Sequence, residues 1–342
     1  MIECRNLGKS YGTVQAVSDI SLSLDEHEFL SILGPSGCGK STLLRLIAGL
    51  EVPSQGQVFL HGQEISGRKI ILPPERRKFG MIFQDFALFP HLSVKDNVEY
   101  GASGSKKEKQ QRVHELLELV GLPHLATKMP HQISGGEQQR IAVARALAPR
   151  PRLILMDEPF SNLDYQLRQQ LRRDIREILK HEGVATVLVT HDQVEAITFS
   201  DRMLLMQKGK VVQEGTPSEI YQNPQTIWAS SFVGEANHLP VEWQNDSLQT
   251  PLGELNVPSE IGMNARIMMV RPEDFKLESV PADQANGIVK SVDFSGSVQT
   301  VGVALKSGAS VQVSGSPHLL WNQDDSVTVS YTHLTLPTKR IV

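Results

Sequence analysis

The chain has 342 residues, about two domains' worth, and 40% of them are apolar, which supplies a sizeable core and excludes global disorder. Lys and Arg number 34 against 38 Asp and Glu, and the formal net charge of −4 disfavours a dedicated nucleic-acid binder, which carries a basic excess. Two cysteines (Cys4 and Cys38), no signal-like apolar start and no run of about 18 apolar residues predict a chain of a reducing cytoplasm without disulfides or a membrane span.

Up to about Glu235, short apolar runs alternate with segments of helical periodicity, the pattern of an α/β fold whose sheet is covered by helices. Three runs have the fully apolar composition of buried parallel strands: 29–34, 152–157 and 185–190. The sequence therefore predicts a parallel sheet in this part of the chain.

Two segments of this part predict helices with clear ends. Apolar residues recur at helical spacing over 113–120, before Gly121, and over 167–179, before Gly183. The stretch 101–112, GASGSKKEKQQR, predicts a polar loop leading into the first helix. After Asn237 short alternating stretches such as 311–313 and 327–329, separated by Gly, Ser and Pro, predict a small β domain.

The strongest motif is GPSGCGKST at 34–42, which matches G-x-x-x-x-G-K-[ST] between an apolar strand and the helical segment LLRLIAGL. Its glycines permit a backbone whose N–H groups all point at a β-phosphate, and the next helix adds the positive end of its dipole. A lysine then supplies a cation for the phosphate oxygens and a serine a hydroxyl ligand for Mg²⁺. The predicted nucleotide-binding residues are Gly34, Pro35, Ser36, Gly37, Cys38, Gly39, Lys40, Ser41 and Thr42.

Asp157 and Glu158 end the second apolar run. A carboxylate at the end of a buried strand can hold Mg²⁺ through water, and its neighbour can orient or deprotonate an attacking water. Taken alone, an acidic pair in this place is more typical of a polar loop. Combined with the phosphate loop, it predicts a hydrolysis site.

The segment 131–140, HQISGGEQQR, resembles the signature motif of the ATP-binding cassette (ABC) family. The family's other motifs are present in order: Tyr11, the phosphate loop, Gln84 in MIFQDFALFPH, the Asp157–Glu158 pair, SNLD at 161–164 and His191 in VLVTHD. They cover residues 11–191 at ordinary spacing, so the chain is identified as a member of this family. The resemblance implies a P-loop nucleotide-binding domain over 1–235, with a helical subdomain at about 85–147.

The resemblance also implies ATP and Mg²⁺ as cofactors and assigns roles to single residues. Glu158, His191 and Gln84 would be catalytic, and Ser41, Gln84 and Asp157 would hold Mg²⁺. Tyr11 would stack on adenine. Outside this array, a strand-end histidine or an edge tyrosine is typical of an ordinary structural role.

Two copies of such a domain pair head to tail in this family, so that each ATP lies between one phosphate loop and the signature of the other copy. The signature residues implied at the nucleotide are Ser134, Gly135, Gly136 and Glu137, together with Asp164 of the SNLD motif. Ser134 and the amides near Gly136 form a second helix N-terminus, which can face the γ-phosphate only from outside.

Two departures from the family pattern bear on activity. The usual signature reads Leu-Ser-Gly-Gly-Gln, whereas this chain has Ile133 and Glu137. A carboxylate near phosphate is unfavourable but suits the helix dipole, so we expect hydrolysis to survive; the alternative is a regulator that binds ATP without turnover. Cys38 is expected as a small filler, and the alternative is a thiol whose modification blocks the nucleotide site.

The chain resembles the subunits of bacterial importers more than soluble ABC ATPases, because it has one cassette, no heptad run and no CxxC pair. In importers the surface beside Gln84 receives a coupling helix from the membrane subunit. Candidates for the apolar lining of that groove are Phe86, Leu88, Phe89 and Pro90, of which at least two are expected in the core instead. The resemblance implies a peripheral ATPase at the cytoplasmic face of the inner membrane, with two transmembrane permease subunits, indirectly a periplasmic solute-binding protein, and no nucleic acid. A soluble ABC ATPase with no transport role is the alternative.

The segments 215–224, 232–239 and 270–277 resemble the junction and body of the oligosaccharide/oligonucleotide-binding-like (TOBE-type) β domain of importer ATPases, implied here over 236–342. Such domains dimerise the ATPases or bind regulators. The domain has 7 basic and 11 acidic residues and few aromatics, so its fold does not imply nucleic-acid binding. The last dozen residues, 331–342, do not continue the preceding pattern and are either native or a cloning scar.

The ATPase of an importer does not touch the cargo, so only subfamily resemblance bears on it. The stretches 72–94, 157–164 and 232–237 resemble most closely the ATPases of ferric-iron importers. ATPases of polyamine, sulfate, thiamine and sugar importers share most of these residues. We expect a ferric-iron importer ATPase, with a polyamine importer as the alternative.

Overall fold

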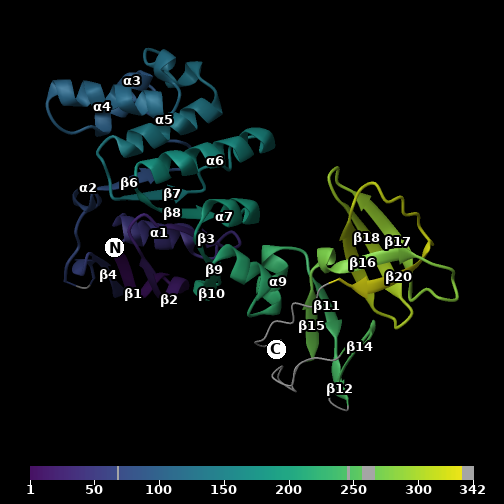
Figure 1. Cartoon of the computed structure of the whole chain (residues 1–342). Coiled ribbons are helices and arrows are strands. Elements are labelled where there is room, and N and C mark those ends of the chain that lie inside the picture. Colours follow the sequence, from purple (N-terminus) through teal and green to yellow (C-terminus); the bar gives the residue numbers. More distant parts are fainter. Residues whose placement is uncertain (68, 245–246, 256–265, 333–342) are drawn as a thin grey trace. The chain divides into compact units, whose positions relative to one another are not determined.

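The computed structural model describes residues 1–67, 69–244, 247–255 and 266–332, and the chain forms two compact units, Met1–Pro217 and Ser218–Val342 (Figure 1). This division falls before the boundary expected after residue 235. Arg271 explains why the intervening helices belong with the second unit, because its buried guanidinium donates hydrogen bonds to the carbonyls of Tyr221, Ser230, Gly234 and Glu235. Among the described residues, no helix is both long and apolar enough to cross a membrane.

A six-stranded sheet forms the centre of the first unit, in the order β10-β9-β3-β8-β7-β6, and only β10 is antiparallel to its neighbour. Its strands are β3 (Phe29–Leu33), β6 (Phe79–Ile82), β7 (Leu153–Asp157), β8 (Ala185–Thr190), β9 (Arg202–Gln207) and β10 (Lys210–Gly215). The three strands predicted from apolar runs are confirmed. Every residue of β3 and β8 is buried, which explains why their sequences do not alternate.

A second, antiparallel sheet in the order β2-β1-β4-β5 completes this unit. It consists of β1 (Ile2–Tyr11), β2 (Val14–Leu24), β4 (Gln55–Leu60) and β5 (Gln63–Ser66). Its buried residues, among them Leu7, Ile20 and Val58, share one apolar cluster with helix α1 (Lys40–Ala48), which follows the phosphate loop.

The segment 85–147 is helical wherever it is regular. It contains α3 (Val94–Gly101), α4 (Lys106–Leu119), α5 (Gly135–Leu147) and the short 3-10 turns η1 (Pro123–Leu125) and η2 (Pro130–Gln132). The predicted polar loop 101–112 is wrong from Lys106 onward. A capping box starts α4 there: Ser105 accepts a hydrogen bond from the Glu108 amide, and Glu108 accepts one from the Ser105 amide.

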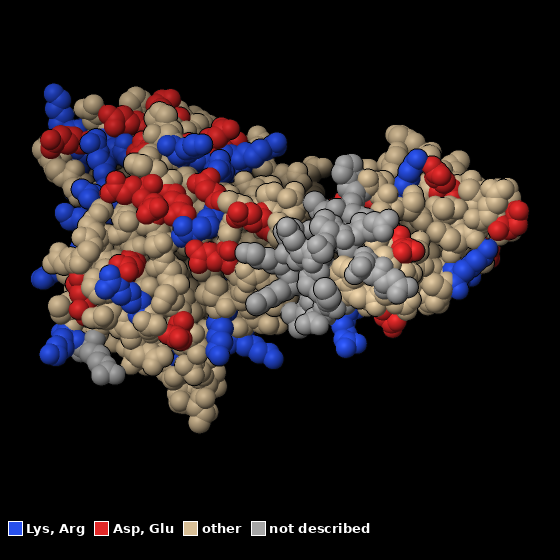
Figure 2. All heavy atoms as spheres, turned by 60° about the horizontal axis from the view of Figure 1, so that its bottom comes forward, with Lys and Arg blue, Asp and Glu red and all other residues tan. Residues whose placement is uncertain are grey.

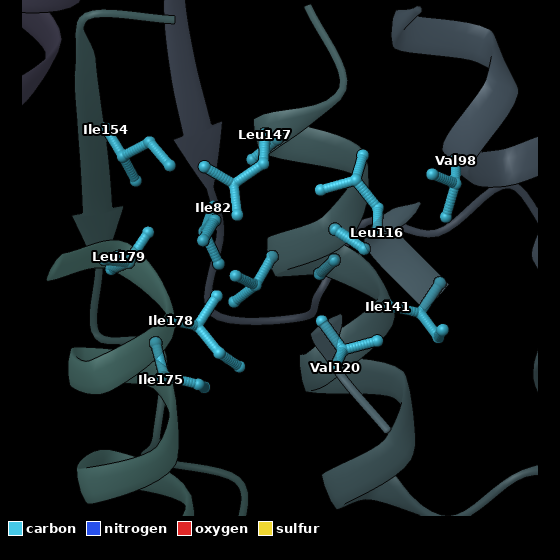
Figure 3. Close-up of a cluster of buried hydrophobic side chains, with 14 of the residues drawn as sticks. Ile82, Val98, Leu116, Val120, Ile141, Leu147, Ile154, Ile175, Ile178 and Leu179 are labelled. Carbon is cyan, nitrogen blue, oxygen red and sulfur yellow. The ribbon is translucent and has the colours of Figure 1, made fainter. Parts of the chain in front are cut away.

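The remaining helices of this unit are α2 (Pro74–Arg77), α6 (Tyr165–His181), which confirms the helix predicted over 167–179, and α7 (Gln193–Phe199). Figure 3 shows how side chains from β6, β7, α3, α4, α5 and α6 form one apolar cluster. Its labelled members are Ile82, Val98, Leu116, Val120, Ile141, Leu147, Ile154, Ile175, Ile178 and Leu179. This cluster joins the helical segment to the edge of the central sheet.

The second unit begins with α8 (Pro217–Gln222) and α9 (Ile227–Val233) and is otherwise antiparallel β structure. Its strands form the pair β11 (Asn237–Pro240) and β15 (Ile267–Val270), the three-stranded sheet β12 (Glu242–Gln244), β13 (Ser247–Thr250) and β14 (Gly253–Leu255), and the five-stranded sheet β16 (Phe275–Ser279), β20 (Ser326–Tyr331), β17 (Gly287–Phe294), β18 (Gln299–Leu305) and β19 (Ser310–Gly315). The strands predicted around 311–313 and 327–329 are confirmed.

The first two of the last dozen residues continue this β structure. Tyr331 pairs with Phe275 at the end of β20, and its hydroxyl lies 3.1 Å from the hydroxyl of Thr250. The Thr332 amide donates a hydrogen bond to the Asp274 carbonyl. Residues 333–342, the rest of the segment for which a cloning scar was considered, lie outside the described residues.

Candidate nucleotide site

Four neighbouring strands bring the predicted site residues to one edge of the central sheet. The phosphate loop follows β3, Gln84 follows β6, Asp157 and Glu158 end or follow β7, and His191 follows β8. These strands are parallel neighbours in the order β3-β8-β7-β6, so their carboxyl ends lie together. This edge is the usual ligand-binding position of an open α/β sheet.

The phosphate loop has a left-handed backbone, which glycine adopts most readily, at two positions. Gly37 and Gly39 have φ angles of 77° and 105°. A Cβ atom on Gly39 would lie 2.0 Å from the Ala16 carbonyl oxygen, so the close approach also excludes any side chain there. Helix α1 begins at the next residue, and its free amides and dipole face the loop. The loop therefore fits a phosphate group.

Lys40 is 4% exposed, and its Nζ donates hydrogen bonds to two carbonyls of its own loop, 2.8 Å to Gly34 and 3.1 Å to Pro35. The partners of the ammonium in these bonds are thus neutral carbonyl groups of the loop and not a carboxylate. An anionic phosphate oxygen accepts a stronger hydrogen bond from it than a neutral carbonyl does.

Ser41 and Asp157, two of the three predicted Mg²⁺ ligands, are in direct contact. The Ser41 hydroxyl donates to Oδ1 of Asp157 at 2.7 Å, across 116 residues of sequence. A hydroxyl and a carboxylate are the hard oxygen ligands that Mg²⁺ prefers, so this pair fits the ion. The third predicted ligand, Gln84, is exposed, and its backbone carbonyl accepts a hydrogen bond from the Asn162 side chain at 2.9 Å.

Glu158 and His191 form a second contact at this edge, with Oε2 of Glu158 2.9 Å from Nδ1 of His191. Glu158 has a φ of 47°, a left-handed conformation that non-glycine residues adopt rarely and mostly where function or surrounding bonds require it. Two hydrogen bonds hold it: its amide donates to the Val189 carbonyl at 2.9 Å, and its carbonyl accepts from the Ser161 hydroxyl at 3.0 Å. The carboxylate is therefore fixed beside the histidine.

A polar network of residues that were not predicted involves Thr190 and Asp192, the two neighbours of this histidine in the chain. The Thr190 hydroxyl donates to the buried Glu195 carboxylate at 2.5 Å and accepts from the Asp192 amide at 3.0 Å. Burial raises the pKa of Glu195. Arg168 extends the network to the SNLD motif, because it contacts Asp192 and donates to the Leu163 carbonyl at 2.9 Å. Thr190, Asp192 and Glu195 lie close together in the sequence, whereas Arg168 reaches Asp192 across 24 residues, a contact that no local pattern marks.

Tyr11 lies outside these contacts, at the end of β1. Its ring is 45% exposed, and Nζ of Lys9 lies 5.0 Å from the ring centroid. Burial and the nearby Glu51 raise the pKa of its hydroxyl, which also lies beside Thr42 of the phosphate loop. The ring is accessible to a stacking partner, and its role at adenine stays a prediction.

The signature residues form a self-contained turn at the start of α5. Ser134 caps the helix: its hydroxyl accepts from the Glu137 amide at 3.4 Å and donates to the Glu137 carboxylate at 2.8 Å, and the same carboxylate accepts from the Ser134 amide at 2.7 Å. These bonds lower the pKa of Glu137, with the Ser134 amide as the main cause. Figure 1 shows α5 grouped with α3 and α4, apart from α1. Asp164 is likewise an exposed cap, of α6, and accepts from the Leu167 amide at 3.0 Å.

The structure also bears on the expected role of Cys38 and on the four candidates for the groove. Cys38 is 4% exposed, and burial raises its thiol pKa, which favours the filler interpretation over a reactive thiolate. Of the four groove candidates, Phe86 is buried and Leu88 packs against the helical core, as expected for at least two of them. Phe89 is half-buried and Pro90 exposed, so these two stay candidates for the groove.

The comparisons with known proteins agree with this geometry. A family model described as ABC transporter matches residues 17–161, and one described as TOBE domain matches 268–333. An Fe(3+) ions import ATP-binding protein of Pseudomonas fluorescens is 42% identical over 308 residues, which cover 89% of this chain and 87% of that protein. The chain belongs to the ATP-binding subunits of the ABC transporter family. It is an ABC-type ATPase with a C-terminal TOBE domain, which confirms the predicted fold class and enzyme class.

Other relatives of this ABC ATPase are named for different cargoes. A putrescine transport ATP-binding protein of Escherichia coli is 41% identical over 325 residues, 90% of this chain and 85% of its own. A sulfate/thiosulfate import ATP-binding protein of Chromobacterium violaceum is 42% identical over 300 residues, 85% and 81% of the two chains. Among solved structures, a dimeric bacterial ABC transporter cassette matches with a TM-score of 0.56 and 34% identity over 64% of this chain and 99% of its own.

Proposed function

We propose that this ABC ATPase powers the uptake of ferric iron, as a peripheral subunit on the cytoplasmic face of a bacterial inner membrane. The cargo rests on relatives named as Fe(3+) import proteins, which match along most of the chain. A polyamine importer is the second candidate, because the putrescine relative is nearly as similar. Lys and Arg are interspersed with Asp and Glu on the face shown in Figure 2, which gives no support to the alternative of a nucleic-acid-dependent ABC ATPase.

The observation that carries the catalytic proposal is the contact of Glu158 with His191 beside the Ser41–Asp157 pair. Lys40 and the loop amides bind and orient the phosphates of ATP, and Ser41 and Asp157, with Gln84, hold Mg²⁺. Bound there, the ion would supply positive charge to offset the negative charge of the phosphates. Glu158 orients the attacking water and accepts its proton at a carboxylate oxygen.

With both ring nitrogens protonated, His191 donates a hydrogen bond from Nδ1 to the Glu158 carboxylate, which keeps that group in place, and one from Nε2 toward the γ-phosphate. The left-handed backbone of Glu158 supports this assignment, because the Val189 and Ser161 bonds hold it in a disfavoured conformation. Tyr11 stacks on the adenine.

The second half of each site comes from another copy of the chain in this proposal. Ser134, Gly135 and Gly136 present amides and a hydroxyl at the start of α5, with Glu137 in the same turn and Asp164 at the neighbouring cap. Ser134 and Asp164 bond within their own turns, whereas the amides at the first positions of α5 have no partner within the helix and are the donors that a nucleotide held by another copy would meet. A related cassette solved as a dimer supports the pairing of two copies.

The membrane partners in this proposal are two permease subunits, whose coupling helices dock near Gln84 against Phe89 and Pro90. A periplasmic binding protein delivers the cargo to them. ATP binding closes the dimer and moves the permeases, and hydrolysis at Glu158 resets it.

The test is uptake of radiolabelled ferric iron by cells that lack this protein and carry either the wild type or Glu158→Gln. We expect only the wild type to restore uptake. If both strains take up iron as well as cells that never lost the protein, the iron assignment is wrong. The same cells are then tested with radiolabelled putrescine and sulfate. If Glu158→Gln restores uptake as well as the wild type does, the catalytic role of Glu158 is wrong.

A further inference from the structure

The chain between β6 and α3, residues 83–93, has no helix or strand and contains Gln84. Its backbone turns through two consecutive left-handed residues, Phe86 with a φ of 60° and Ala87 with a φ of 48°. Neither is a glycine, so this turn needs other bonds to hold it. The two conformations also direct the carbonyls of Phe86 and Ala87 toward one donor.

That donor is Arg145. Its Nη1 donates to the Ala87 carbonyl at 2.6 Å and its Nη2 to the Phe86 carbonyl at 3.0 Å. The same guanidinium lies 5.4 Å from the ring centroid of Phe89. A planar fork matches two adjacent carbonyls, which a lysine ammonium at the same place does not reproduce. The Arg145 side chain thus contacts three residues of the segment.

Arg145 belongs to the last turn of α5, the helix that Ser134 caps at its other end. The thirteen residues of α5 span about 20 Å, and the backbone hydrogen bonds of the helix make it a rigid element. Ile141 and Leu147 of this helix are fully buried in the cluster of Figure 3, which fixes the helix to its neighbours. The contacts of Arg145 therefore connect the helix that begins at the signature turn to the segment beside Gln84.

Other side chains hold the two ends of the same segment. Asn162 donates to the Gln84 carbonyl at 2.9 Å. The buried side chain of Asn97, on α3, accepts from the Phe89 amide at 2.8 Å and donates to the Leu92 carbonyl at 3.0 Å. Between them, Arg145 supplies a connection to α5 in the middle of the segment.

We propose that Arg145 is a positioning residue that couples the signature helix to the segment 83–93, so that nucleotide-driven movement of one is transmitted to the other. This inference rests on the proposed function, because it requires ATP binding at the phosphate loop and a partner docked beside Gln84. Coupling between two sites is reciprocal, so a shift of the segment also biases the signature helix.

The test is hydrogen–deuterium exchange of the full chain carrying Glu158→Gln, with and without ATP and Mg²⁺. In this parent we expect ATP to change amide exchange in peptides covering 83–93. Addition of Arg145→Lys is expected to leave ATP affinity unchanged and to abolish that change. The matched control is Arg140→Lys, on the same helix, where the arginine donates to the Val120 carbonyl and to Asp174 instead of the segment. It is expected to keep the ATP-dependent change.

A purely structural role for Arg145 would lower the melting temperature and raise exchange equally with and without ATP. The proposal is overturned if the ATP-dependent change survives in a folded Arg145→Lys variant, if Arg140→Lys abolishes it equally, or if the parent binds ATP without any change over 83–93. A parent that does not bind ATP overturns the proposed function and this inference with it. Should Arg145→Lys not fold, Arg145→Gln takes its place, because it keeps a side-chain amide but removes the paired guanidinium donors to the Phe86 and Ala87 carbonyls. Loss of the ATP-dependent change in a folded Arg145→Gln variant supports the coupling, and its survival overturns it.

Discussion

The bonds that build the two halves of the proposed nucleotide site differ greatly in their reach along the chain. At the phosphate loop, Ser41 contacts Asp157 across 116 residues, and Glu158 contacts His191 across 33. At the signature, Ser134 and Glu137 are three residues apart. The first half exists only when four strands lie side by side, whereas the second is complete within one helical turn. In the proposed function, a single folded copy therefore binds the nucleotide through the first half, and its signature turn would act on the nucleotide of another copy.

A second comparison separates structure from function within the same unit. Helix α4 begins with a capping box of Ser105 and Glu108 that repeats the one of Ser134 and Glu137, with the same 2.7 Å and 3.4 Å bonds. Both boxes lower the pKa of their glutamate. Because the two turns are alike in capping, a variant that affects only the signature turn reports on the nucleotide rather than on the helix.

The largest effect is expected from replacing Glu158, the proposed catalytic carboxylate in the phosphate-loop half of the site. Glu158→Gln should lower ATP turnover by about 10²–10⁴-fold, since the water loses its base, while ATP binding persists. A closed dimer should then accumulate on size-exclusion chromatography with ATP and Mg²⁺. The control is Glu177→Gln, an exposed position on α6. A Glu158→Gln protein that elutes as a monomer under these conditions would contradict the role of Glu158.

The next effect concerns phosphate binding in the same half. Lys40→Ala removes a buried ammonium, and hydrogen bonds to charged groups contribute about 1.5–3 kcal/mol, so ATP affinity should fall by about 10–100-fold. Titration with a fluorescent ATP analogue measures it. Lys210→Ala, at an exposed position of β10, should bind like the wild type. Equal affinity of Lys40→Ala and wild type would place the phosphates elsewhere.

The third variant changes Ser134 in the signature turn, the other half of the proposed site. Ser134→Arg should prevent ATP-dependent dimerisation, because a bulky cation at the helix start fills the space for the partner's nucleotide, and should leave nucleotide binding by the monomer intact. Ser105→Arg removes the equivalent cap of α4 and should still dimerise in the Glu158→Gln background. Light scattering with and without ATP distinguishes the two. Loss of monomer binding in Ser134→Arg would show that the signature acts on its own copy's nucleotide.

The smallest effect sharpens the comparison of the two capping boxes. A lowered pKa in the folded chain means that each glutamate stabilises the fold above the ordinary carboxyl pKa of about 4.3, and that this contribution is lost as the pH falls through the folded pKa. Glu137→Gln and Glu108→Gln should therefore lower the melting temperature slightly at pH 7, with differences from wild type that vanish in acid. Thermal melts between about pH 3 and 7 measure this.

Only Glu137→Gln should also change ATP-dependent dimerisation, since it alone removes a negative charge beside the partner's phosphates. An equal effect of Glu108→Gln on the dimer would mean that the departure from the usual signature has no bearing on ATP.

The elements predicted from sequence are those whose burial leaves a local mark. The runs 29–34, 152–157 and 185–190 are apolar throughout because β3, β7 and β8 have both faces covered. The start of α4 was missed because none of the residues 106–112 is a core residue, so no apolar periodicity marks these two turns. Only its capping box marked that end.

The sequence by itself determined the phosphate loop, the signature turn and the order of the motifs, since each depends on residues a few positions apart. Only the tertiary structure decided that Ser41 meets Asp157, that His191 meets Glu158, and that Arg145 grips Phe86 and Ala87 across 59 and 58 residues. Such contacts depend on which strands become neighbours in the sheet and on how α5 packs against its edge. Burial of apolar surface over the whole unit sets both, and no single segment carries that information.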